Sequence, residues 1–220
     1  AGINLNSSAI WDIADIPVSE MGDYKAASAA IKTIQSQEGP LFLSAGIYRP
    51  HVPWIVPQTY FDLYPPETLR LSERRKEDLD DLPERLKLVA GFEAKFGKGY
   101  HEKLVKKDYD KQFVRAYLAS VTFADEQVGR ILDAWYASSY AKTGYVVLWS
   151  DHGYMLGEKQ AWSKIKPWYD SSRSNFMIAG PDLPKGTICG KAVSLLDLYP
   201  TLVELLDLPK PPQEFDGNSL

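Results

Sequence analysis

The chain has 220 residues and a mass of 24.7 kDa, which is enough for one large domain or two small ones with a sizeable core. Hydrophobic residues make up 45% of the sequence and charged residues 25%, which excludes a disordered or low-complexity chain. The formal net charge is -4 at pH 7. Because this balance gives no overall positive field to attract phosphate backbones, nucleic acid is not an expected partner.

The sequence contains no pattern typical of a membrane anchor. Its longest unbroken apolar run covers residues 145–149, whereas crossing a bilayer takes about 20 residues. We therefore expect no transmembrane segment, and no signal region is recognised. Cys189 is the single cysteine, so an internal disulfide is impossible and the cellular compartment stays open. Since the first residue is Ala1 rather than Met, we expect the chain to be part of a longer protein.

The first part of the chain predicts a helix followed by a buried strand. Apolar or small side chains recur every three or four positions in residues 21–37, which is typical of an amphipathic helix, and Gly39-Pro40 ends it. Residues 41–47 form a short apolar run between turn signals, which favours a buried strand. The prolines and aromatic residues that alternate in 48–66 indicate a stiff loop rather than an ordinary helix or a central strand.

Two charged stretches follow this loop. Residues 70–87 mix both signs of charge, and residues 95–111 are rich in lysine. Such runs usually form a solvated surface. Binding of an anionic polymer is the alternative interpretation.

The second half of the chain predicts helices that alternate with strands. Residues 113–137 carry an apolar stripe at helical spacing. Residues 145–149 suit a strand that is buried on both faces, and residues 176–179 form a second short strand. Residues 195–206 predict a helix in which Pro200 marks a boundary or kink. This order predicts an α/β fold with a mostly parallel, mixed sheet flanked by helices.

Asp151 and His152 follow directly after the strand predicted at 145–149. Ligands of open α/β sheets bind beyond the carboxyl ends of the strands. A carboxylate beside an imidazole suits a divalent cation, and Gly153 would allow a sharp turn. Two ligands do not complete a metal site. The alternative interpretation is a capping aspartate next to a buried, hydrogen-bonded histidine.

His51 and Lys164 are the other candidates for chemistry. His51 lies between two prolines after the 41–47 run, where a rigidly held imidazole suits a hydrogen-bond donor or general acid. Packing among the neighbouring aromatic residues is the alternative. Lys164 has the charge to pair with an anion, although most lysines face solvent. His101 has no partner in the sequence and is predicted to lie at the surface.

Several stretches, taken in order, carry a family resemblance. They are LFLSAGIYRPHVPW (41–54), YFDLYP (60–65), ASV (119–121) with DEQVGR (125–130), SDHGY (150–154) with LGEK (156–159), AGP (179–181) and SLLDLYPTL (194–202). In this series they resemble the type I sulfatases of the alkaline phosphatase superfamily, and most of all the iduronate-2-sulfatase-like branch.

The resemblance implies a sulfuric ester hydrolase that acts on a sulfated carbohydrate in the periplasm or outside the cell. It implies that Asp151 and His152 are two ligands of the family's calcium ion. It also implies that His51 touches the sulfate or the leaving-group oxygen and that Lys164 binds a sulfate oxygen. These roles agree with the chemistry, because the breaking S–O bond gathers negative charge that a cation, a lysine and a proton-donating histidine stabilise.

The family's nucleophile is a formylglycine made from a Cys/Ser-x-Pro-x-Arg motif, and no such motif occurs in these residues. The sequence after Cys189 does not match it. The resemblance therefore describes residues 1–220 as part of a sulfatase catalytic domain without the N-terminal nucleophile region, the paired aspartates that complete the calcium site, and the C-terminal subdomain. We expect the chain to be inactive on its own, with the N-terminal part of the same protein as its partner.

Local departures from the family pattern leave the substrate open. Met155 and Ala161 stand where related bacterial sequences often carry His, and Ser174-Asn175 replaces a Val-Pro pair. Two alternative functions also stay open. One is a phosphate or phosphonate ester hydrolase of the same superfamily, and the other is a non-catalytic module that binds sulfated glycans.

Overall fold

The structure, a computed structural model, combines helices and short strands and describes residues 10–73, 75, 77–91 and 99–220. The α-helices are α1 (Gly22–Ser36), α2 (Gln58–Asp62), α3 (Glu84–Gly91), α4 (Tyr100–Lys106), α5 (Tyr109–Ala137), α6 (Tyr169–Ser172) and α7 (Leu198–Leu205). The strands are β1 (Trp11–Ile13), β2 (Trp54–Val56), β3 (Val146–Trp149), β4 (Met155–Leu156), β5 (Trp162–Ser163) and β6 (Phe176–Ala179). Short 3-10 helices are η1 (Val18–Glu20), η2 (Pro66–Thr68), η3 (Ser139–Lys142), η4 (Glu158–Gln160) and η5 (Leu195–Asp197). The predicted α/β class is confirmed.

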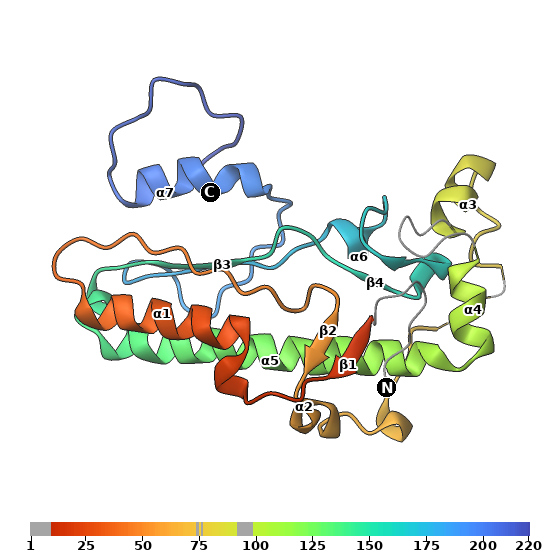
Figure 1. The fold of residues 1–220 in the computed structure, drawn as a ribbon. Helices are drawn as coiled ribbons and strands as arrows, with labels where there is room; N and C mark the ends of the chain where they lie inside the picture. Colours follow the sequence, from red (N-terminus) through yellow and green to blue (C-terminus); the bar gives the residue numbers. More distant parts are fainter. Residues whose placement is uncertain (1–9, 74, 76, 92–98) are drawn as a thin grey trace.

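Helix α5 runs along one side of the molecule, and α1 packs against it (Figure 1). The helices predicted at 21–37 and 113–137 are confirmed, although α5 begins earlier than predicted. Arg130 of α5 joins the two helices, because its guanidinium lies 3.7 Å from the centre of the Tyr24 ring and donates to Ser28 Oγ at 2.8 Å. A cation–π contact therefore reinforces the apolar packing between α1 and α5.

The strands form three separate pairs. β1 pairs with β2 in parallel, whereas β3 pairs with β6 and β4 pairs with β5 in antiparallel fashion. Among the described residues, the parallel direction predicted for most of the sheet thus occurs in one pair. The strands predicted at 145–149 and 176–179 are confirmed, and they hydrogen bond to each other. Their register places Trp149 opposite Phe176, so the end of β3 lies beside the start of β6.

Two segments differ from the structure predicted for them. Residues 41–47 form no helix and no ladder within the described part of the chain, and Phe42 is 82% exposed. The buried strand predicted here is wrong because no described element covers this run. The loop predicted at 48–66 contains β2 and α2. Pro53 and Pro57 flank β2 rather than interrupt it, so its own N–H groups stay available for pairing.

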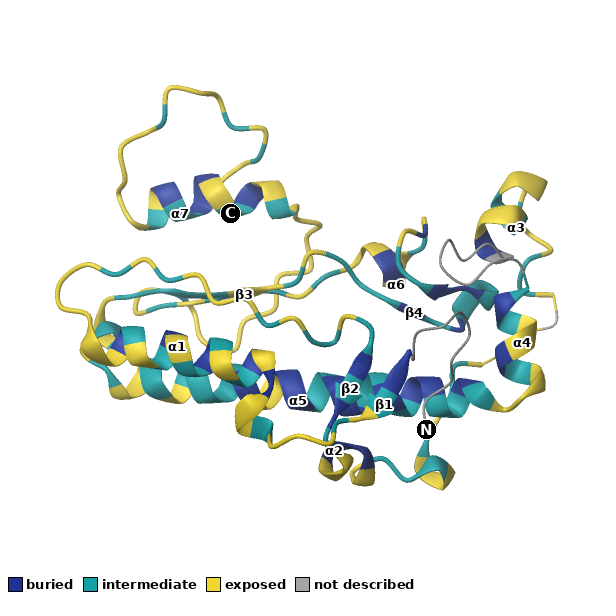
Figure 2. Cartoon of the chain, in the orientation of Figure 1, coloured by how far each residue is buried: buried dark blue, intermediate teal, exposed yellow. Residues whose placement is uncertain are grey.

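Strand β3 is less buried than predicted. Burial on both faces is wrong, because Leu148 and Trp149 are 36% and 48% exposed. Figure 2 shows the contrast between this region and the buried residues of β1, β2 and the neighbouring half of α5. The strand is exposed because it borders an open cavity.

The C-terminal helix and the charged stretches agree with the sequence patterns. The helix predicted at 195–206 is divided into η5 and α7, which begins at Leu198 close to the boundary predicted at Pro200. Lys103, Lys106 and Lys107 are exposed, as a solvated surface requires. The positions at 95 and 98 lie outside the described residues. In the part of the chain that is described, no helix combines the length and apolar character needed to cross a bilayer.

Aromatic side chains form the centre of the core. The Trp54 ring of β2 packs edge-on against Phe113 of α5 with 4.6 Å between ring centres, and Trp162 of β5 lies 4.9 Å from Phe113 in a similar geometry. Each of the three is at most 1% exposed. Such edge-to-face pairs add to the free energy gained from burial. Two strand pairs are therefore anchored on one face of α5.

Replacing Phe113 with Ala should lower the free energy of unfolding by about 3–5 kcal/mol, because it removes the ring that both tryptophans contact. The matched control is Phe42→Ala, which should change it by about 0.5 kcal/mol or less because this ring is exposed. Urea denaturation followed by tryptophan fluorescence measures both. Equal losses in the two variants would contradict a core centred on Phe113.

Candidate functional site

The four candidate residues His51, Asp151, His152 and Lys164 line one large cavity of about 2400 Å³. Its walls are residues 39–52, one face of α5, β3 with the segment that follows it, and part of α7. The accessible surface of the chain is 14360 Å², whereas a folded monomeric protein of this mass exposes about 10,000 Å². The candidate residues therefore line one open space whose walls are largely apolar.

His51 is held by contacts to one side of its ring. Its Nδ1 lies 2.7 Å from the Val52 carbonyl oxygen and 2.8 Å from the Tyr48 hydroxyl. The Tyr48 and His51 rings are 4.9 Å apart between centres. Among the described residues, no hydrogen bond engages Nε2. The exposed imidazole is thus fixed in orientation, and it packs against the Tyr48 ring, as the alternative interpretation also expects.

Asp151 and His152 lie at the carboxyl end of β3, as the sequence predicts. Their side chains are 78% and 30% exposed, and Asp151 Oδ2 lies 3.6 Å from His152 Nε2. His152 Nδ1 lies 2.7 Å from the Gly153 carbonyl oxygen. A carbonyl can only accept, so the neutral ring carries its proton on Nδ1 and presents a lone pair on Nε2.

Lys164 follows β5 and reaches this pair from the neighbouring hairpin. Its Nζ lies 3.0 Å from His152 Nε2, so the ammonium donates to the lone pair of that nitrogen. The contact joins residues 12 positions apart in the sequence. The Lys164 ammonium therefore contacts the imidazole of this pair.

The donor set at this position fits one side of a calcium site. Asp151 offers an open carboxylate, and the bond from His152 Nδ1 to a backbone carbonyl is the usual support of a metal-binding imidazole. Calcium takes about 6 to 8 ligands. No group of three or more His, Cys, Asp or Glu side chains in the described residues could hold a metal ion. The described residues thus offer two candidate ligands and no complete shell.

Gly153 has a different role from the predicted sharp turn. A Cβ at this position would lie 2.1 Å from the Asp170 carbonyl oxygen and 2.4 Å from that of Arg173. The Gly153 N–H also donates to the Ser171 carbonyl at 3.0 Å. Glycine is required here because the backbone after Asp151 and His152 passes directly against α6.

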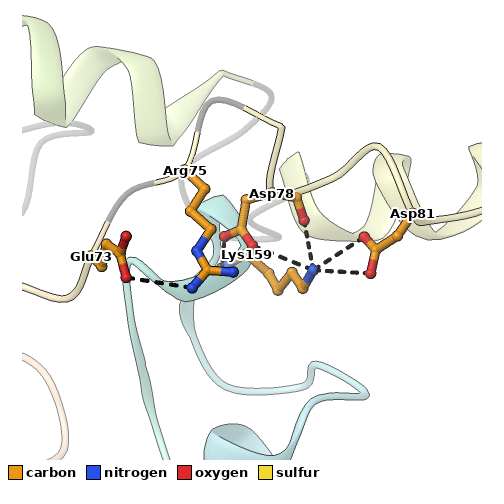
Figure 3. A network of polar contacts seen from close by, with 5 residues as sticks. All are labelled: Glu73, Arg75, Asp78, Asp81 and Lys159. Carbon is orange, nitrogen blue, oxygen red and sulfur yellow. Dashed lines mark hydrogen bonds and ion pairs between the residues drawn. The ribbon is translucent and has the colours of Figure 1, made fainter.

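The hairpin of β4 and β5 that carries Lys164 is pinned at its tip by Lys159 (Figure 3). Lys159 Nζ donates to the Asp78 carbonyl at 2.6 Å and to Asp81 Oδ1 at 3.1 Å, while the Lys159 N–H donates to Asp78 Oδ2 at 3.0 Å. The hydrogen bond to Asp81 is the main reason that the pKa of Lys159 is raised. Lys159 and Gln160 both have left-handed backbone angles, with φ of 50° and 54°. Such angles are costly for these residue types, and the bonds to residues 78–81 offset that cost.

Sequence reasoning missed the residues that support the site. Tyr48 stands three positions before His51 and was signalled only by its place among the aromatic residues. Lys159 and its aspartate partners carried no signal beyond their charge. The surface position predicted for His101 is wrong: it is half-buried, and its Nδ1 accepts a hydrogen bond from Trp162 Nε1 at 3.1 Å. These contacts all join positions far apart in the chain or depend on ring orientation.

The α/β fold is shared with sulfatase and phosphonate monoester hydrolase structures of the alkaline phosphatase-like fold. The family model described as Sulfatase matches residues 2–208. The chain therefore belongs to the sulfatase family.

Relatives from bacteria and animals agree with this assignment. A sulfatase of Formosa agariphila is 38% identical over 195 residues, which cover 86% of this chain and 37% of the relative. Iduronate 2-sulfatase of Mus musculus is 24% identical over 249 residues, covering 92% of this chain and 43% of that protein. The phosphonate monoester hydrolase of Agrobacterium radiobacter has the same fold, with a TM-score of 0.80 at 23% identity over 94% of this chain and 42% of its own. The chain thus spans less than half the length of these proteins.

Replacing Lys159 with Met should speed amide hydrogen exchange at residues 157–161, because the turn loses its bonds to Asp78 and Asp81. Hydrogen exchange measured by mass spectrometry or NMR tests this. Lys87→Met is the control, since the Lys87 ammonium pairs with Glu84 of its own helix, α3. Unchanged protection at 157–161 would contradict the role given to Lys159.

Proposed function

We propose that this chain is part of a periplasmic or secreted sulfatase that hydrolyses sulfate esters of a carbohydrate. The observation that carries the proposal is the meeting of His51, Asp151, His152 and Lys164 on one cavity. Family membership supports the reaction class. Because the chain spans 37% and 43% of two of its relatives, the activity is that of a longer protein.

Lys164 and His51 act on the substrate in this proposal. The Lys164 ammonium binds a sulfate oxygen and stabilises the negative charge on the reacting group. His51 donates a proton from Nε2 to the leaving-group oxygen as the S–O bond breaks. The neutral ring that results keeps its remaining proton on Nδ1, where the Val52 carbonyl accepts it. The orientation of His51 therefore suits a general acid.

Asp151 and His152 would hold one side of a calcium ion. The carboxylate and the Nε2 lone pair are the contributing atoms, and the remaining ligands would come from the part of the protein outside this chain. When bound, calcium would stabilise negative charge on the sulfate group. The Lys164 ammonium would then bind the sulfate beside Asp151 and His152, instead of donating to His152 Nε2.

A formylglycine nucleophile is expected from the same outside part. The large apolar cavity supports this arrangement, since exposed apolar walls of such extent are typical of a surface that another polypeptide covers. Residues 41–47 and β3 both carry backbone groups that further strands could pair with. The outside part would thus complete the core and the active site together.

The chain on its own should not hydrolyse a chromogenic sulfate ester or a sulfated saccharide, because its sequence has no formylglycine motif and its described residues offer no full set of calcium ligands. Release of inorganic sulfate by the pure chain, quantified by ion chromatography, is the measurement. Turnover that persists after purification to constant specific activity would contradict the proposal that the active site needs a further part of the protein.

In a full-length form, Lys164→Ala and His51→Ala should each lower the rate of sulfate ester hydrolysis by about 10²-fold or more. Lys103→Ala is the matched control, since this lysine is exposed on α4 away from the cavity lining. Rates of all three variants near the wild-type value would mean that neither side chain contacts the reacting group.

The alternative reaction is hydrolysis of a phosphate or phosphonate ester, which the fold shared with a phosphonate monoester hydrolase favours. Both esters present tetrahedral oxyanions to similar groups. Comparing kcat/KM for matched sulfate and phosphonate esters in the full-length form decides between them. Saturable binding of sulfated oligosaccharides by a full-length form without any product would instead identify a glycan-binding module.

A further inference from the structure

Asp23 is a buried carboxylate that the chemistry above does not use. It lies in the first turn of α1 and is 6% exposed. Its Oδ1 accepts the Tyr48 N–H at 2.7 Å, and its Oδ2 accepts the Arg49 N–H at 3.2 Å. Burying a carboxylate is costly unless its oxygens are hydrogen-bonded. Here both oxygens are bonded to two consecutive residues that lead to His51.

Tyr48 continues this chain of contacts to the imidazole. Its hydroxyl donates to the Val52 carbonyl at 3.0 Å and lies 2.8 Å from His51 Nδ1. Its ring also lies against the His51 ring. Trp54 supports the same turn, because its Nε1 donates to the Pro50 carbonyl at 2.6 Å. The backbone on both sides of His51 is thereby fixed.

The arrangement of donors and acceptors selects one form of the imidazole. The Val52 carbonyl can only accept, and it lies 2.7 Å from His51 Nδ1. Nδ1 must therefore carry a proton, which it shares between this carbonyl and the Tyr48 oxygen. In the neutral ring Nε2 then holds the lone pair, and this is the nitrogen left to face the cavity that His51 lines.

We propose that Asp23 and Tyr48 are positioning residues that hold His51 in its Nδ1–H form with Nε2 turned to the cavity. The proposal rests on the proposed function for its purpose, since a histidine that gives up a proton from Nε2 must end in this form. Asp23 fixes the Tyr48 backbone, and Tyr48 fixes the ring. Neither residue touches the substrate.

The ¹⁵N resonances of the His51 ring nitrogens show which nitrogen carries the proton, and no substrate is needed to record them. The experiment records the ¹⁵N resonances of the imidazoles by NMR at about pH 8, above the usual histidine pKa. The chain has three histidines, and the spectrum of His51→Gln identifies the signals of His51. The wild-type protein should show His51 mainly as the Nδ1–H form.

Tyr48→Phe and Asp23→Ala should each shift the ratio of the two neutral forms of His51 toward Nε2–H by about threefold to tenfold, the effect of losing one hydrogen bond. Tyr48→Phe keeps the ring and its packing, so it decides the matter if Asp23→Ala does not fold. A wild-type His51 that is mainly Nε2–H, or an unchanged ratio in folded Tyr48→Phe, overturns the proposal.

Asp197→Ala is the matched control for Asp23. Asp197 is 8% exposed and also accepts two backbone N–H groups, from Ser194 at 2.7 Å and from Asn218 at 2.8 Å. Its loss should leave the His51 signals unchanged. An equal shift in Asp197→Ala would mean that general loosening, not positioning, moves the ratio.

The outcome separates this proposal from the proposed function. If full-length protein fails to hydrolyse sulfate esters while the His51 ratio shifts as stated, the positioning role stands and the reaction assigned to the site is wrong. If the full-length protein is active, Asp23→Ala and Tyr48→Phe should lower kcat more than they change KM. A rise in KM alone would overturn the positioning role.

Discussion

The fold depends on covering the apolar face of α5 along its whole length. From Phe113 to Phe123 this face is buried by the aromatic side chains of β2 and β5 and by α2. Further along the helix, α1 packs against α5, and Val128, Ile131 and Trp135 line the cavity. One helix therefore has a finished core at one end and an open wall at the other. The candidate site lies beside the open wall, so its surroundings are set by burial that this chain does not complete.

The sequence predicted the long helices, because their pattern of apolar residues lies within one continuous segment. The 3.6-residue period located α1 and α5 because a helix satisfies its own backbone and needs one apolar face. Strands were harder to predict from the sequence, since an apolar run becomes a strand only when another strand pairs with it. Residues 146–149 pair with β6, whereas residues 41–47 pair with no strand among the described residues. The run at 145–149 is unbroken, whereas Ser44 and Gly46 interrupt the run at 41–47.

The same distinction applies to the candidate site. Asp151 and His152 were recognisable because they follow an apolar run directly, and β3 does place them at its carboxyl end. The contact of Lys164 with His152 could not be read from spacing, because it depends on the hairpin turning at Lys159 through a left-handed backbone. Asp23 carried no signal at all, since its partners are backbone N–H groups 25 and 26 positions away. A side chain that bonds to a backbone group places no requirement on the type of its partner residue, so the contact is hard to predict from the sequence.

In the proposed function, completion of the fold and completion of the chemistry would be physically the same event. Asp151 is 78% exposed, so water weakens its interaction with any cation, and Lys164 turns to His152. A polypeptide that filled the cavity would exclude that water and lower the local dielectric, which strengthens every interaction between charged groups at the end of β3. It would also cover residues 41–47, whose far end leads into the turn that carries His51. The open apolar walls and the weakly assembled charges thus have one cause, the uncovered face between α5 and β3.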